Sequence, residues 1–114
     1  MIVKSLNETP LMKNAHGVDA RNLYNTDNAM ITVITLKPGE SLKKHITPVD
    51  VAFYVLEGTG IVEIGDKKEQ VFRDMLVESP KDIVHCWYNE SDDILKFMVV
   101  KVPKPKTKSI FLSD

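Results

Sequence analysis

The chain has 114 residues, a formal net charge of -1 and a single cysteine, which together predict one domain. A nearly balanced charge gives no electrostatic basis for nucleic acid or an anionic membrane surface as the main partner. Cys86 has no partner for an intramolecular disulfide, no charged and apolar leader opens the chain, and no apolar run approaches a membrane span. These features predict a cytoplasmic protein with neither a nucleic-acid nor a membrane partner.

The pattern along the chain predicts an all-β fold. The first 28 residues show no sustained period and contain several Asn and Asp turn formers, so we expect at most short strands there, at residues 2–6 and 20–24. Short apolar segments separated by Gly, Pro, Asn and Asp turns then follow at 29–36, 50–56, 60–64, 69–72, 75–78, 83–88 and 94–102. Short strands at such regular spacing are typical of a β-sandwich or β-barrel.

We divide this single domain into an N-terminal arm or strands (1–28), a barrel (29–103) and a C-terminal tail (104–114). Lys and Pro alternate in the stretch KVPKPKTK, residues 101–108, and its prolines predict the end of the last strand. The apolar residues 110–112 are expected to dock on the barrel or on a partner subunit.

The stretch 38–60, PGESLKKHITPVDVAFYVLEGTG, places His45 between a Pro-Gly turn and an apolar strand. The two-residue period of a strand puts Val51, Phe53 and Val55 on one face. Ala52, Tyr54 and Leu56 then share the other face, which is also apolar. We therefore expect both faces of this strand to be covered, in keeping with a homodimer.

Two motifs in this region resemble those of the cupin superfamily. The first, G-x5-H-x-H-x(3 or 4)-E-x6-G, matches from Gly39 through His45 to Gly58, and the second, G-x5-P-x-G-x2-H-x3-N, matches at Pro80, His85 and Asn89. Asp74 and Asp82 stand where the second motif has glycines. The resemblance implies a single-domain cupin, a jelly-roll β-barrel also called a double-stranded β-helix.

The metal ligands of the family are carried over only in part. At the four ligand positions that the resemblance implies, this chain has His45, Thr47, Val51 and His85. Two imidazoles make a weak, open site for a divalent transition metal such as Zn, Fe, Mn or Ni. Asp50 could complete it if a bulge turned its carboxylate inward, although a turn residue before a strand is the simpler interpretation. The other candidates are Glu57, Glu63, Glu78 and His16, and we expect His16 to be an exposed loop residue rather than a ligand.

A ligand pocket is the second expectation for the two histidines. Strand alternation places Ile83, His85 and Trp87 on one face, so the inward histidine would have the indole beside it. Apolar walls with a few convergent polar groups are typical of small-molecule sites. The expected pocket consists of His45, Thr47, Val51, Phe53, Val55, Met75, Val77, His85 and Trp87. The alternative is that both histidines are core residues satisfied by the backbone or by the threonine.

Three functions follow from these expectations. The first, which we favour, is a module that binds a small molecule, a transition metal or both through His45 and His85. The second is a metal-dependent oxygenase or isomerase. The third is a metal-free sugar isomerase or epimerase with a histidine as general base, since imidazole titrates near neutral pH. The fold alone does not choose between them.

Overall fold

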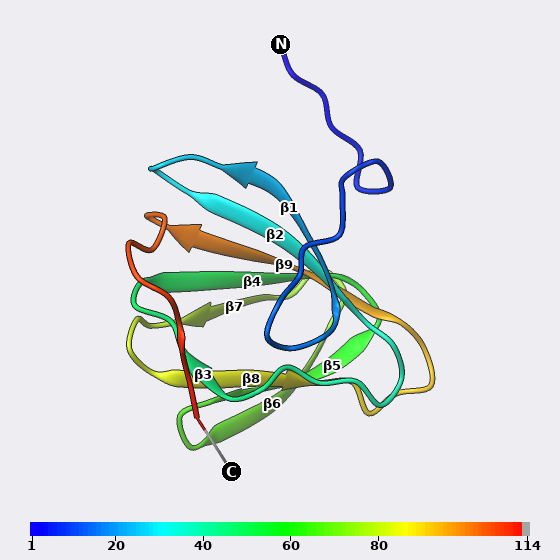
Figure 1. The fold of residues 1–114 in the computed structure, drawn as a ribbon. Helices are drawn as coiled ribbons and strands as arrows, with labels where there is room; N and C mark the ends of the chain where they lie inside the picture. Colours follow the sequence, from blue (N-terminus) through cyan, green and yellow to red (C-terminus); the bar gives the residue numbers. More distant parts are fainter. Residues whose placement is uncertain (113–114) are drawn as a thin grey trace.

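The computed structural model describes residues 1–112, which form two five-stranded antiparallel sheets and no helix (Figure 1). The strands in chain order are β1 (Asp19–Asn25), β2 (Met30–Leu36), β3 (His45–Ile46), β4 (Asp50–Glu57), β5 (Thr59–Ile64), β6 (Lys67–Phe72), β7 (Leu76–Ser79), β8 (Val84–Tyr88), β9 (Leu95–Val102) and β10 (Ile110–Phe111). One sheet has the order β1-β2-β9-β4-β7 and the other β10-β3-β8-β5-β6. Among these residues no helix is available that could cross a membrane.

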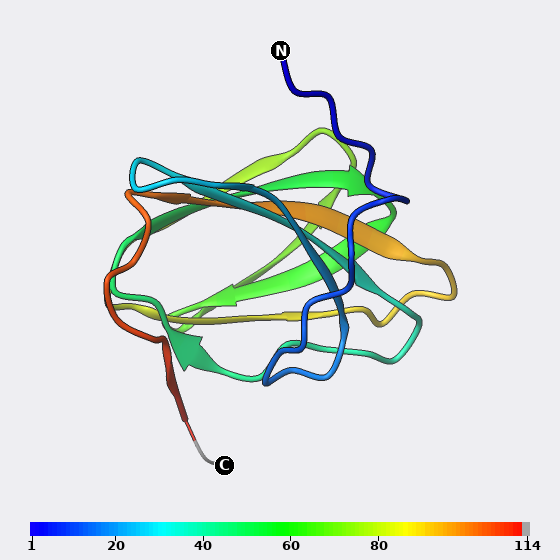
Figure 2. The same ribbon diagram turned by 45° about the horizontal axis from the view of Figure 1, so that its top comes forward.

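The predicted strands of the barrel are confirmed, with small shifts at their ends. Strand β1 also forms close to the expected 20–24 segment, whereas residues 2–6 form no strand. The N-terminal arm instead runs outside the sheets before it turns back into β1 (Figure 2). The Arg21 guanidinium holds this arm by donating to the carbonyls of Leu6, Asn7 and Thr9.

Turns at the motif positions adopt the left-handed backbone region. Gly58 has φ of +84°, and a Cβ there would collide with the carbonyl oxygen of Ile94. Asp74 and Asp82, which replace the motif glycines, have φ of 70° and 65°. Aspartate tolerates this conformation better than most residues with a Cβ. The two substitutions therefore keep the turn geometry of the motif.

The core lies where the inner faces of the two sheets meet. Trp87 of β8 stacks on Phe97 of β9 with ring centroids 4.1 Å apart, and Phe53 of β4 packs edge-on against both rings. In β4, Val51 and Val55 are buried on the same inner face as the phenylalanine. The other face of β4 is only half-buried, so residues 1–112 do not provide the second cover that we expected for this strand.

The C-terminal tail docks on the barrel of its own chain. Strand β10 pairs with β3, placing Phe111 opposite His45 and Ile110 opposite Ile46. Leu112 extends this contact by donating its backbone N–H to the Lys44 carbonyl at 3.0 Å. The tail thereby covers one edge of the second sheet.

Candidate functional site

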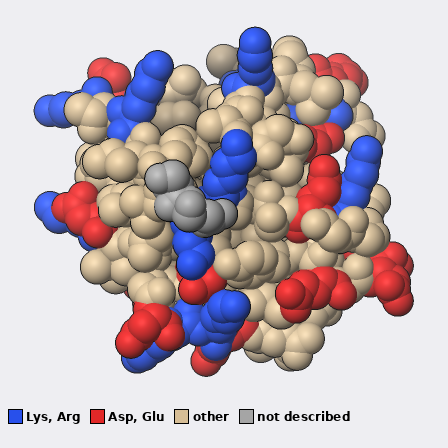
Figure 3. All heavy atoms as spheres, turned by 60° about the horizontal axis from the view of Figure 1, so that its bottom comes forward, with Lys and Arg blue, Asp and Glu red and all other residues tan. Residues whose placement is uncertain are grey.

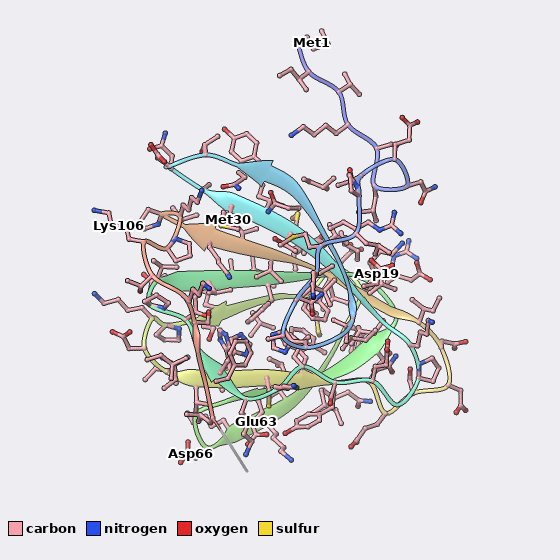
Figure 4. The ribbon with its side chains drawn as sticks, in the orientation of Figure 1. Met1, Asp19, Met30, Glu63, Asp66 and Lys106 are labelled. Atoms are coloured by element: carbon pink, nitrogen blue, oxygen red, sulfur yellow. The ribbon has the colours of Figure 1, made fainter. Side chains whose placement is uncertain are left out.

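A cavity of about 620 Å³ lies between the two sheets. Its walls come from the inner faces of β1, β2, β4 and β9 on one side and from β3 and β8 on the other, and residues 12–16 and 105–111 border it. Figure 4 shows the side chains of both sheets pointing into the space between them, with Met30 of β2 labelled. All three histidines of the chain line this cavity, namely His16, His45 and His85.

His45 and His85, called the histidine pair below, form the polar centre of the cavity. They are direct cross-strand neighbours in β3 and β8, and their Nε2 atoms lie 3.0 Å apart. The Nδ1 atom of His45 lies 2.8 Å from the Lys43 carbonyl oxygen, and that of His85 lies 2.7 Å from Ser79 Oγ. Thr47 Oγ1 is 3.2 Å from His85 Nε2. Both rings are therefore anchored at both nitrogens.

These partners determine where the ring protons lie. A carbonyl oxygen only accepts, so Nδ1 of His45 carries a proton and donates to Lys43. In neutral His45 the Nε2 atom is then an acceptor, and His85 Nε2–H donates to it. Nδ1 of neutral His85 is left as an acceptor for the Ser79 hydroxyl. The arrangement is complete with both imidazoles neutral.

Burial keeps the histidine pair neutral. It lowers the pKa of His85 to about 3, with a further contribution from the neighbouring His45. Burial also lowers the pKa of His45, against the opposing effect of its hydrogen bond to Lys43. No carboxylate contacts either ring within residues 1–112 to stabilise an imidazolium.

The prediction that His16 is an exposed loop residue is wrong. Its ring is half-buried, lies 4.9 Å from that of His45 between centroids, and contacts Phe111 at 5.2 Å. Its Nδ1 accepts the backbone N–H of Lys43 at 2.9 Å. Burial lowers its pKa to about 4. The Asn14 side chain, which hydrogen-bonds to the backbone of residues 12, 16 and 18, shapes the loop that carries it.

The structure brings only part of the expected pocket together. The lining includes His45, Thr47, Val51, Phe53 and His85. The remaining four residues of the expected pocket lie elsewhere. Val55 and Trp87 are fully buried in the core. Met75 is exposed, and Val77 faces a separate cavity of about 450 Å³ beside β5 and β6.

Asp50 does not approach the histidine pair. Its carboxylate is exposed and accepts the backbone N–H of Lys81 at 2.9 Å. The register of β4 against β9 is regular from Asp50 through Val55, and its irregularity comes only between Val55 and Glu57. Strand alternation therefore turns Val51 inward and Asp50 outward. The bulge that would have made Asp50 a ligand is absent.

The other carboxylate candidates also lie away from the cavity. Glu57 is exposed beside Lys96, Glu63 accepts from the Tyr88 hydroxyl at 2.7 Å, and Glu78 is exposed. Within residues 1–112 no three His, Cys, Asp or Glu side chains gather as a set that could hold a metal ion. The donor set that a resident transition metal would need is thus incomplete.

Three contributors to the site were missed by the sequence reasoning. Ser79 orients His85, Phe111 stacks on His45 with centroids 5.4 Å apart, and Lys101 lines the cavity. Lys101 follows Val99 by two residues in β9, so strand alternation could have placed it inward. The contact between Phe111 and His45 depends on the path of the C-terminal tail, and no local sequence pattern predicts it.

Comparison with known families now identifies the fold. The family model described as Cupin domain matches residues 32–101. The chain belongs to the cupin family. Uncharacterized protein MJ0764 of Methanocaldococcus jannaschii is 31% identical over 85 residues, which cover 74% of this chain and 73% of that protein.

Solved structures, one of them described as a cupin, superpose closely on this chain. The structure of MJ0764, described as an RmlC-like cupin with a double-stranded β-helix fold, has a TM-score of 0.76 at 28% identity and covers 93% of this chain and 95% of that one. The polyketide cyclase RemF of Streptomyces resistomycificus gives a TM-score of 0.84 at 20% identity, over 100% of this chain and 88% of that one. At that identity the second likeness shows the fold alone. The predicted jelly-roll cupin barrel is thereby confirmed.

Proposed function

We propose that this cupin binds a small organic molecule in the cavity, with the histidine pair as its polar anchor. The observation that carries the proposal is the composition of the wall. Apolar side chains such as Ile34, Leu42 and Phe53 surround two buried imidazoles in a space of about 620 Å³. A mostly apolar hollow of this size with few convergent polar groups is typical of small-molecule sites.

The state of the histidine pair favours binding over general-base catalysis. A general base works best when its pKa lies near the operating pH, and burial lowers that of His85 to about 3. A ligand carbonyl or hydroxyl oxygen can still accept from the Nε2–H of neutral His85 by sharing the bond that His85 donates to His45, so that no second lone pair has to be freed. The metal-free isomerase is therefore the weaker proposal.

The donor set likewise disfavours a metal-dependent enzyme. Catalytic zinc sites use three protein ligands, whereas the cavity provides the two Nε2 atoms of the histidine pair with Thr47 beside them. Moreover, both Nε2 atoms would have to offer a lone pair to one ion, and the hydrogen bond between them would be lost. We therefore propose a binding function in which no step depends on a metal.

The proposal can be tested with prodan, a neutral naphthalene ketone whose emission reports the polarity around it. The wild-type chain should bind one prodan molecule with blue-shifted emission. Thr32→Trp, which places a large ring in the cavity from β2, should abolish binding. Thr35→Trp on the opposite face of the same strand is the matched control and should bind normally.

The polar anchor is tested separately by His45→Ala and His85→Ala. Each should weaken prodan binding about fivefold, since a buried hydrogen bond contributes on the order of 1 kcal/mol. Circular dichroism would establish that the fold persists. If both variants bind as the wild type does, the site lies elsewhere.

A further inference from the structure

The side chains that carry charge around the cavity are all lysines. Within residues 1–112 its lining contains Lys13, Lys101 and Lys108 beside the three neutral histidines, and no Asp or Glu. This contrasts with the outer surface, where acidic and basic side chains are intermixed on the face shown in Figure 3. Although the chain carries a formal net charge of -1, the cavity is basic.

Lys101 is the cation set most deeply in this lining. It extends from the inner face of β9 two residues after Val99, and it is less exposed than Lys13 or Lys108. Within residues 1–112 its ammonium has neither an ion-pair partner nor a hydrogen bond. By comparison, Lys96 on the outer face of the same strand lies 4.0 Å from Glu57.

The positive charge of Lys101 acts on the whole site. It lines the same cavity as His16, His45 and His85, and its charge contributes to the lowered pKa of each of these histidines. Burial lowers the pKa of Lys101 itself. Placing an unpaired cation inside a protein is costly, and an anion in the same space would offset that cost.

We propose that the molecule bound in the cavity is an apolar carboxylate, whose charged end pairs with Lys101 and whose body lies against the apolar wall. This inference rests on the proposed binding function and narrows its ligand to an organic acid. The neutral histidine pair would lie beside the carboxylate without a negative charge to repel it, and only an N–H of the pair could donate to it. Lys101 is half-buried, and a charge-assisted hydrogen bond to such a lysine is stronger than a neutral one.

A matched pair of probes tests the inference, 2-naphthoate and the neutral 2-naphthamide of nearly the same shape. The wild-type chain should bind 2-naphthoate at least about tenfold more tightly, as measured by calorimetry. Lys101→Met should reduce that preference to within about twofold, and Lys101→Gln should do the same. Lys96→Met, the control on the outer face of β9, should keep the preference.

The outcomes separate the two levels of the proposal. If the wild type binds acid and amide equally, or if both Lys101 variants keep the preference, the carboxylate inference is overturned while the cavity remains a binding site. If neither naphthyl probe nor prodan binds, the binding function is overturned and the inference with it. Removing a half-buried charge that has no ion-pair partner within residues 1–112 should leave the fold intact, which thermal unfolding of both variants would verify.

Discussion

His45 and His85 are direct partners in the register of β3 and β8, and their Nε2 atoms lie 3.0 Å apart. Their sequence separation is 40 residues, so the contact exists only because the two short strands pair. Ser79 from the other sheet and the Lys43 carbonyl complete the arrangement. The histidine pair is thus held by both sheets.

Metal content is the first quantity we would measure. After chelator treatment and reconstitution with Zn, Fe, Mn and Ni in turn, we expect far less than one ion per chain by elemental analysis, because two imidazoles alone bind weakly. A His45→Ala, His85→Ala double variant provides the background. One ion per wild-type chain would contradict the expectation and would direct the search for a third ligand to His16, whose ring already lies 4.9 Å from that of His45.

Ser79→Ala is expected to lower the free energy of unfolding by about 1–3 kcal/mol, because Nδ1 of buried His85 would lose its donor. Denaturant unfolding measures the change, with the exposed Ser41→Ala as a control near zero. Nitrogen-15 shifts of the imidazoles give an independent reading. In the wild type they should show the proton of His85 on Nε2 and that of His45 on Nδ1, and the reverse pattern would contradict the proton assignment.

Stability should fall as the pH drops below about 6.5, the ordinary pKa of histidine. The folded-state pKa of His85 is lowered to about 3, so between these values the unfolded chain binds a proton that the folded chain does not. Stability then rises with pH, and His85 contributes a slope approaching 1.4 kcal/mol per pH unit. Above pH 6.5 both states hold His85 neutral, so its slope vanishes and the stability that is lost at lower pH is fully present. Urea unfolding from pH 7 to pH 5 should show a shallower slope in His85→Asn, and equal slopes would contradict the burial argument.

Gly58→Ala should destabilise the barrel more than Gly39→Ala. Gly58 has φ of +84° and Gly39 has φ of +86°, so alanine at either position introduces a similar backbone strain of about 1 kcal/mol. A Cβ at Gly58 also meets the backbone of Ile94, whereas nothing lies within 4 Å of one at Gly39. We expect an additional loss of at least about 1–2 kcal/mol at Gly58. Equal losses of unfolding free energy in the two variants, measured by urea unfolding, would show that the backbone around Ile94 can shift to accommodate the added Cβ.

The sequence by itself determined the all-β fold, most of the strands and the motif turns. Those features depend on local pattern: a two-residue apolar period, turn residues at regular spacing, and glycines or tolerant aspartates where φ is positive. Strand alternation also placed His85 and Phe53 on inner faces correctly. Strand alternation also placed the Asp50 side chain outward, as observed. Asp50 became a candidate metal ligand only through the additional hypothesis of a bulge, which the structure does not show.

Only the tertiary structure decided which residues share the cavity. Alternation tells which face a side chain occupies but not how far along the barrel it lies. All four of Val51, Phe53, Val55 and Trp87 belong to the core, but only Val51 and Phe53 also line the cavity. His16 and Phe111 reach the site from segments whose paths depend on long-range contacts, with the Lys43 backbone and with β3. The burial that keeps the histidine pair neutral follows from the packing of both sheets, as does the lack of an ion-pair partner for Lys101 within residues 1–112. Neither is encoded in a local pattern.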